Sequence, residues 1–427
     1  MTSVISKPSV NIQLQLLSFM SIAHFIHHVQ LYAFPAMIIL ISQEISLSYL
    51  QIGILGSLPI FVMAVTSPLV GYLGKSVRTG FSIVISGILL FALSSFMIAI
   101  SNDYTYLLMG NIVLGLGCTT FHPIGLGVSA NSFSGQNRGK AMAVNHAAGV
   151  IGTATSPFVT LGLAVFIFGW RHTFWLLGIG CFFILILMIF WLILQKLVPN
   201  YLTIMDIEKE ITKINNNTPR SDLGKWIIIT LGVLLTISAF RGGVYRLISF
   251  FTVTLLRDFY NVGSFEAGVL TSFILLLGSG SDVYGAYISD KSGAYGRVKI
   301  IIVSAVGTSV AILGLMFLTV NFSEIWAIVL GFSLFAISFY LAGGTLQALM
   351  SDIVPQEKRT FFYSIVFSLG LVVSSTAPTI FGALLDLFRS PVGGFAFILV
   401  LISGSFVMAL IFQRRIDFAI KHDLINP

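Results

Sequence analysis

The sequence predicts an all-α membrane protein whose twelve transmembrane helices form two pseudo-symmetric six-helix bundles. Three observations support this prediction: an apolar composition, twelve apolar stretches of helix length, and an internal repeat divided by a polar segment at the midpoint. Of the 427 residues, 56% are hydrophobic and 9% are charged, and the mean hydropathy is +0.97. Because a soluble domain has about 25% charged residues, we expect lipid to surround most of this chain.

The twelve stretches are long enough for helices that cross the membrane, since about 30 Å of hydrocarbon requires about 20 apolar residues. Lipid offers no partner for open backbone, and the continuous hydrophobicity does not fit the alternating pattern of a β-barrel. The expected spans are 12–40, 49–73, 80–101, 105–133, 140–166, 173–197, 225–256, 265–289, 298–320, 323–350, 361–386 and 392–413.

The basic residues predict the orientation, because Lys and Arg are enriched in cytoplasmic loops. With the N-terminus inside, 18 of the 23 Lys and Arg residues fall on the cytoplasmic side. We therefore expect cytoplasmic N- and C-termini in a cell membrane, the prokaryotic inner or cytoplasmic membrane. The net charge of +7 reflects this topology, so the expected partner is the lipid bilayer and no nucleic acid. The first apolar run has no cleavage site after it and is expected to remain as the first helix.

The two halves of the chain repeat each other. Gly53 in YLQIGIL matches Gly268 in SFEAGVL, and Arg138 in SGQNRGKA matches Arg359 in VPQEKRTF. The order and agreement of such matches indicate a duplicated six-helix unit. We expect an N-terminal six-helix bundle at 1–197, a cytoplasmic central loop at 198–224, and a C-terminal six-helix bundle with a short cytoplasmic tail at 225–427.

The loop after the eighth span resembles a motif of the major facilitator superfamily, Gly-x-x-x-Asp-Arg/Lys-x-Gly. In YISDKSG, Asp290 and Lys291 take the acidic and basic places, and Ala286 replaces the first glycine. In the first copy Lys75 occupies the acidic place. The chain resembles this superfamily over essentially its whole length. The resemblance implies a transporter and not an enzyme, with substrate bound near the midplane between the halves and alternating access by rocking.

The stretch at 115–157 is similar to fosmidomycin-resistance-like members of the superfamily. Their FHPEG reads FHPIG here, with Ile124 in place of the acid. Asn111 stands where many proton-driven drug antiporters have an arginine. Because of the similarity at 115–157, drug efflux by proton antiport is the alternative function within the same class. The differences at Ile124 and Asn111 are the reason that it is not the first choice. A channel and a membrane enzyme are alternatives from other classes: a channel would show unsaturable flux, and an enzyme would turn over a lipid substrate.

The first span contains HFIHH, with His24, His27 and His28. H-x-x-H-H resembles one histidine box of membrane di-iron enzymes, but those enzymes have several boxes and this chain has no second one, so we expect no metal and no cofactor. Positions i, i+3 and i+4 lie on one face of a helix. Ionisable groups inside a membrane usually face the bundle interior and are functional candidates. Two interpretations stay open: the histidines line the substrate pathway, or they hydrogen-bond neighbouring helices.

The repeat places AFRGGVYRL of the seventh span opposite AHFIHHVQL of the first. Arg241 and Tyr245 are four residues apart and share a helical face, whereas Arg246 lies about 140° further round. We expect Arg241 to contact the substrate, and Arg246 to be a second contact or a structural partner. A salt bridge between Arg241 and Asp282 is the alternative.

The balance of charge inside the spans favours an anion. Away from their ends, the spans contain two arginines and several histidines but one acid, Asp282. The planar arginine guanidinium can form two parallel hydrogen bonds with a carboxylate or phosphate. Histidine titrates near neutral pH, so we expect proton coupling by symport, or by exchange if two anions compete. His24, His28 and Asp282 are the expected proton-coupling residues. The expected substrate-binding residues are His24, His27, His28, Arg241, Tyr245, Arg246, His122, Asn145 and His146.

Charged loop residues are expected to act as gates. Asp290 suits the positive N-terminus of the fifth span near Arg138, while Lys75 needs Glu357 as a partner at the eleventh span. The alternative is that these are solvated loop charges. The expected gating residues are Asp290, Lys291, Arg138, Lys75, Glu357 and Arg359. The expected partners are a small-molecule substrate and protons, and the protein is expected to act as a monomer.

Overall fold

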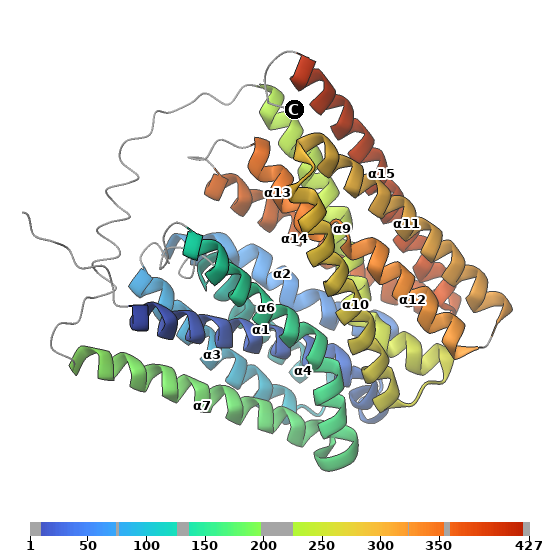
Figure 1. Cartoon of the computed structure of the whole chain (residues 1–427). Coiled ribbons are helices and arrows are strands. Elements are labelled where there is room, and N and C mark those ends of the chain that lie inside the picture. The colour runs from blue at the N-terminus through green and yellow to red at the C-terminus, as the bar shows by residue number, and fades with distance from the viewer. Residues whose placement is uncertain are drawn as a thin grey trace, which may run out of the picture. The chain divides into compact units, whose positions relative to one another are not determined.

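The structure is a computed structural model, and it describes residues 10–73, 77–125, 136–197, 225–322, 324–353 and 359–421. Helices joined by short turns make up this part of the chain (Figure 1). In chain order they are α1 (Val10–Glu44), α2 (Tyr49–Leu73), α3 (Val77–Ala99), α4 (Tyr104–Thr119), η1 (Phe121–Gly125), α6 (Gln136–Leu163), η2 (Ala164–Phe168), α7 (Gly169–Leu197), α9 (Lys225–Tyr260), α10 (Ser264–Asp290), α11 (Gly293–Asn321), α12 (Ile325–Tyr340), α13 (Gly343–Ile353), α14 (Arg359–Phe388) and α15 (Pro391–Lys421).

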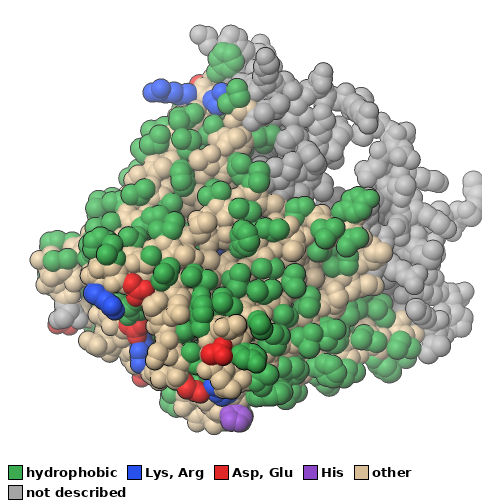
Figure 2. All heavy atoms as spheres, turned by 180° about the vertical axis from the view of Figure 1, so that it is seen from behind, with side chains coloured by type: hydrophobic (Ala, Val, Ile, Leu, Met, Phe, Trp, Pro, Cys, Tyr) green, Lys and Arg blue, Asp and Glu red, His purple; other side chains and the backbone are tan. Residues whose placement is uncertain are grey.

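The helices have the length and composition of membrane spans. Within the described ranges, ten stretches are long and apolar enough to cross a bilayer; α6, η2 and α7 form one of them, and α4 is a shorter apolar helix. Hydrophobic side chains spread over much of the face in Figure 2, where charged side chains are few. Large apolar groups are exposed on the helices, such as Leu69 at 62% and Val320 at 70%. The predicted class, an all-α membrane protein of the twelve-span type, is confirmed.

Two expected spans are interrupted in the structure. The span expected at 105–133 begins as α4, ends at Thr119 and continues as the π-helical turn η1, after which residues 126–135 lie outside the described part. The span expected at 323–350 divides into α12 and α13. The second break has a clear stabilising contact, because the Asp282 carboxylate accepts a hydrogen bond from the Gly344 N–H at 2.7 Å. A carboxylate at a helix N-terminus satisfies a backbone donor that has no partner within its own helix.

The helices group into two compact units. Unit 1 contains residues 1–34 and 65–219, and unit 2 contains residues 35–64 and 220–427. Residues 35–44 at the end of α1 and residues 49–64 of α2 thus group with the C-terminal helices. The six-and-six division at the central loop stays a prediction for the domains, because residues 198–224 lie outside the described ranges.

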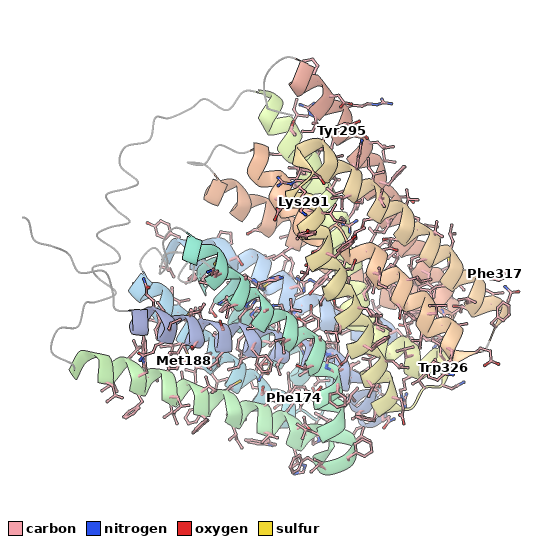
Figure 3. The ribbon with its side chains drawn as sticks, in the orientation of Figure 1. Phe174, Met188, Lys291, Tyr295, Phe317 and Trp326 are labelled. Atoms are coloured by element: carbon pink, nitrogen blue, oxygen red, sulfur yellow. The ribbon has the colours of Figure 1, made fainter. Side chains whose placement is uncertain are left out.

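In unit 1, polar contacts fix the ends of helices that are otherwise held by apolar packing. Arg171 of α7 donates to the carbonyls of Ala99 at 3.0 Å and Ser101 at 2.6 Å, where α3 ends. Asp103 accepts from the Tyr106 N–H at 3.0 Å and caps α4. Apolar side chains such as Phe174, which Figure 3 labels on α7, fill the space between these ends.

In unit 2, α9 packs against α14 and α15, and α11 packs against α12 and α15. Val298, Ala409 and Phe412 are fully buried within this core. Figure 3 labels Phe317 and Trp326 near the facing ends of α11 and α12, and Trp326 is 76% exposed. Tryptophan is enriched where a membrane meets water, so this end of the helices suits the interface with lipid head groups.

Candidate functional site

Helices α1 and α6 of unit 1 lie side by side (Figure 1), and a chain of side-chain hydrogen bonds joins them. His24 Nδ1 lies 2.8 Å from the Asn145 carbonyl oxygen, and His28 Nδ1 lies 2.8 Å from Thr153 Oγ1. Between them, the Nε2 atoms of His24 and His28 are 3.2 Å apart. Imidazole groups on one face of α1 therefore bind it to α6. The i, i+4 spacing predicted that His24 and His28 share this face, and hydrogen bonds to a neighbouring helix were one of the two interpretations left open.

Two glycines of α6 make this close approach possible. A Cβ atom at Gly149 would lie 2.6 Å from His24 Cε1, and one at Gly152 would lie 2.6 Å from the Phe25 carbonyl oxygen. Both distances are too short for a real Cβ contact. Small residues in membrane helices allow backbones to approach in this way.

Hydrogen-bonding partners indicate the tautomers of the neutral histidines. A carbonyl can only accept, so His24 Nδ1 donates to Asn145 and its Nε2 is left as an acceptor. His28 Nε2 then donates to His24 Nε2, and His28 Nδ1 accepts from the Thr153 hydroxyl. The chain of donors runs in one direction from Thr153 to Asn145.

His27 and His122 complete an aromatic and imidazole cluster in unit 1. The rings of His27 and His122 meet edge to face with centroids 4.7 Å apart, and the His24 ring stacks on Phe121 at 4.4 Å. His122 belongs to the π-helical turn η1, and such turns often occur at functional sites. His24, His27, His28 and His122 thus lie together in unit 1, and their predicted role in substrate binding stays a prediction.

The other two residues predicted from this half differ in their placement. Asn145 is buried, and its backbone carbonyl makes the contact with His24. His146 is exposed on α6, on a different side of the helix from the buried Asn145. Its assignment to substrate binding stays a prediction.

Unit 2 holds Arg241 in a buried position, with 5% of the residue exposed. Its Nη2 group donates to the Ser304 hydroxyl at 3.0 Å and to the Phe339 carbonyl. Its guanidinium also lies over the Phe339 ring, 4.7 Å from the centroid. The Nη1 nitrogen is buried with no hydrogen-bond partner among the described residues. A buried charged donor of this kind is costly unless an acceptor reaches it.

Arg246 and Tyr245 lie nearer the surface of unit 2, and both are half-buried. The Arg246 guanidinium lies 5.1 Å from the centroid of the Tyr245 ring, which meets Tyr340 edge to face at 5.8 Å. The Arg246 Nε nitrogen is buried and has no hydrogen-bond partner in the described part of the chain. Arg241 and Arg246 therefore each have a buried nitrogen donor for which the described part of the chain supplies no acceptor.

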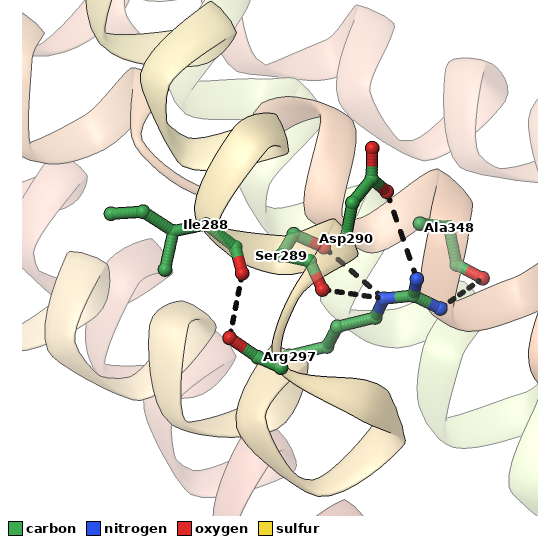
Figure 4. A network of polar contacts seen from close by, with 6 residues as sticks. Ile288, Ser289, Asp290, Arg297 and Ala348 are labelled. Carbon is green, nitrogen blue, oxygen red and sulfur yellow. Dashed lines mark hydrogen bonds and ion pairs between the residues drawn. The ribbon is translucent and has the colours of Figure 1, made fainter.

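The predicted gate at Asp290 has a local ion pair. Arg297 of α11 lies 3.8 Å from the Asp290 carboxylate and donates to Ser289 and to the Ala348 carbonyl (Figure 4). Lys291 lies over the Tyr287 ring, 4.0 Å from the centroid. These contacts join the ends of α10, α11 and α13 within unit 2. Of the other predicted gating residues, Lys75, Glu357 and the side chains of Arg138 and Arg359 lie outside the described residues.

Several residues that hold the two clusters were not predicted from the sequence. Thr153 of GVIGTATSP positions His28, and an uncharged threonine in an apolar helix carries no signal that would have marked it. Ser304, Phe339 and Tyr340 surround the arginines. Nothing marked them, because serines and aromatic residues occur throughout such an apolar chain.

Solved structures with the same fold are transporters. A bacterial homolog to the human lysosomal transporter Spinster, in an inward-facing and unoccupied conformation, has a TM-score of 0.78 at 14% identity and covers 96% of this chain and 99% of its own. A D-xylose-proton symporter has a TM-score of 0.74 at 15% identity, over 95% of this chain and 97% of that chain. These likenesses show the fold, and the long apolar helices define an integral membrane protein.

The family model of the Major Facilitator Superfamily matches residues 20–378, and the chain belongs to that superfamily. A probable L-galactonate transporter of Escherichia coli (strain K12) is 23% identical over 371 residues, covering 81% of this chain and 77% of that protein. The riboflavin transporter RibZ of Clostridioides difficile (strain 630) is 28% identical over 116 residues, which is 27% of this chain and 25% of that protein. The chain is a secondary transporter and not an enzyme, as its sequence predicted.

Proposed function

We propose that the protein carries a small organic anion across a prokaryotic cell membrane by alternating access, coupled to protons, and acts as a monomer. The observation that supports an anion is the pair of arginines in α9, whose buried Arg241 Nη1 and Arg246 Nε atoms have no acceptor in the described part of the chain. A carboxylate or phosphonate would supply those acceptors through charge-assisted hydrogen bonds.

The similarity to a probable L-galactonate transporter supports the same class of substrate. Galactonate is a sugar acid, so its carboxylate needs a cationic group in the protein and its hydroxyls need polar partners. Proton coupling is supported by the fold shared with a D-xylose-proton symporter. The sequence assigns the proton to His24, His28 and Asp282, and this assignment stays a prediction.

The two arginines have different roles in this proposal. Arg246 is half-buried beside Tyr245 and makes the first contact with the anion. Arg241 lies deeper and is held by Ser304 and Phe339, so it presents a fixed positive charge and its Nη1 donors to the same anion. Because hydrogen bonds to charged groups contribute about 1.5–3 kcal/mol, loss of either contact should weaken binding about 10- to 150-fold.

Purified protein in liposomes tests the proposal with labelled carboxylates, phosphonates and cationic dyes under an imposed pH gradient. Arg246→Gln should raise the KM for anion uptake at least tenfold. Arg257→Gln is the matched control, because Arg257 lies on the same helix and is paired with Asp258 at 2.6 Å. Uptake of cations alone, or wild-type anion uptake by both Arg241→Gln and Arg246→Gln, would refute the anion site.

Proton coupling is measured separately in the same liposomes. An acidic outer buffer should drive anion accumulation, and a protonophore should abolish it. Accumulation that ignores the pH gradient would show a uniporter or an exchanger of anions, and the anion site would stand independently of that result.

A further inference from the structure

We infer that, contrary to the expectation of no metal from the single histidine box, His24, His28 and His122 form a binding site for a divalent transition-metal ion such as Zn²⁺. Each residue offers one imidazole nitrogen, and these three atoms all lie within 4.8 Å of one another. Imidazole nitrogen is a preferred ligand for zinc, copper, iron and nickel. The three residues come from two segments far apart in the sequence, α1 and η1, so no single sequence motif contains the site.

The spacing of the first two ligands fits a tetrahedral ion. Nitrogen ligands lie about 2.0–2.1 Å from zinc, so two of them at the tetrahedral angle are about 3.3 Å apart. The Nε2 atoms of His24 and His28 are 3.2 Å apart. Histidines at positions i and i+4 of one helix are also the pair that holds zinc in the H-E-x-x-H motif.

Outer hydrogen bonds orient both imidazoles toward the ion. A histidine that binds a metal through one nitrogen usually donates from the other to a backbone carbonyl or a similar acceptor. His24 Nδ1 donates to the Asn145 carbonyl at 2.8 Å, and His28 Nδ1 has the Thr153 hydroxyl at 2.8 Å. When the ion binds, His28 changes tautomer and donates to the Thr153 hydroxyl, so neither Nδ1 loses its partner.

The third ligand, His122, needs a small movement. Its ring is half-buried and lies edge to face with His24 and His28, with centroids at 5.6 and 5.8 Å. Its nitrogen lies within 4.8 Å of the other two, so the inferred site requires its side chain to rotate toward them when the ion binds. Three protein ligands leave one tetrahedral position open, as in catalytic rather than structural zinc sites, so a water or an anion would complete the coordination.

Zinc binding to the full-length protein tests the inference, using Zn²⁺ alone in detergent or nanodiscs and no polyhistidine tag. Isothermal titration should show one ion per chain, and the melting temperature should rise with the logarithm of the free zinc concentration above the Kd. His122→Ala should weaken zinc binding at least tenfold. His172→Ala is the matched control. His172 is exposed on α7, and its Nδ1 donates to the Phe168 carbonyl at the end of η2.

A second variant keeps the test decisive if His122→Ala folds poorly. Thr153→Val removes the outer partner of His28 but no ligand, and should weaken zinc binding about tenfold while stoichiometry stays at one. Wild-type zinc affinity in both His28→Gln and His122→Ala, or no zinc bound by the wild-type protein at micromolar free ion, would overturn the site. Binding is measured without transport, so the anion proposal can fail while this one holds.

Discussion

Arg241 shows what a cation inside a membrane helix requires from its neighbours. Its guanidinium is buried, stacks on Phe339 and donates to Ser304, which in turn donates to the Ser338 carbonyl at 2.7 Å. These contacts come from α11 and from the end of α12. The arginine is therefore fixed by residues on two other helices, which would lower the entropic cost of ordering it if it binds the proposed anion.

Replacing Ser304 by alanine should destabilise the protein. The substitution removes the acceptor of Arg241 Nη2 and should lower the free energy of unfolding by about 1–2 kcal/mol. Thermal unfolding in detergent measures the change. Ser309→Ala is the control, because Ser309 only bonds the Ala305 carbonyl of its own helix. Equal melting temperatures for the two variants would show that the Arg241 contact is not stabilising.

Gly149 is a residue whose missing side chain positions the histidine cluster. Gly149→Ala places a methyl group 2.6 Å from His24 Cε1, and overpacking of this kind should cost about 1–3 kcal/mol of unfolding free energy. Gly180→Ala in α7 is the control, since a Cβ there meets nothing within 4 Å and should leave stability unchanged or slightly higher. A Gly149→Ala variant as stable as Gly180→Ala would contradict the close packing of α1 on α6.

At the scale of the element, the lengths of the apolar stretches predicted the positions of the helices but not the points at which two of them are interrupted. The spans expected at 49–73 and 265–289 agree with α2 and α10 almost to the residue. The break at residues 341–342 could not be read, because ISFYLAGGTL is apolar on both sides of it. The start of α13 depends on Asp282, which is distant in sequence and reaches it only in the folded chain.

The candidate site was predictable to a similar extent. The i, i+4 spacing was enough to place His24 and His28 on one face. Arg241 was predicted because a charged side chain inside a membrane span is costly and usually functional. The residues that orient them, Thr153 and Ser304, carry no charge and have no periodic signal of their own. Such partners are set by which helices pack together, which a single sequence does not specify.

Asp282 has two roles to separate: the helix cap seen in the structure and the proton carrier predicted from the sequence. Asp282→Asn keeps an oxygen acceptor for the Gly344 N–H, whereas Asp282→Ala removes it and should cost about 1 kcal/mol of stability. If Asp282 is only a cap, the Asn variant should transport with the wild-type pH dependence. A change in the pH dependence of anion uptake by the well-folded Asn variant would instead assign the proton to Asp282.

At the scale of the whole molecule, the first half of α2 is packed tightly on α14 within unit 2. The Asp386 carboxylate accepts from the N–H groups of Tyr49 at 3.1 Å and Leu50 at 2.8 Å. A Cβ at Gly53 would lie 2.2 Å from the Pro378 carbonyl oxygen, so the two backbones are almost in contact. The internal repeat assigns α2 to the N-terminal bundle and α14 to the C-terminal bundle. Rocking of the bundles would therefore have to separate these two helices.

A reversible cross-link between α2 and α14 tests that separation. Ser57 Oγ and Thr379 Oγ1 are 2.8 Å apart, which suits a disulfide in the double variant Ser57→Cys with Thr379→Cys. Oxidation should stop uptake of the labelled anion in liposomes, and a reductant should restore it, because the cross-link holds one conformation. Each single variant is a control, and the native Cys118 and Cys181 are both buried. Unchanged uptake by the oxidised double variant, with the cross-link shown by mass spectrometry, would mean that α2 and α14 stay together during transport.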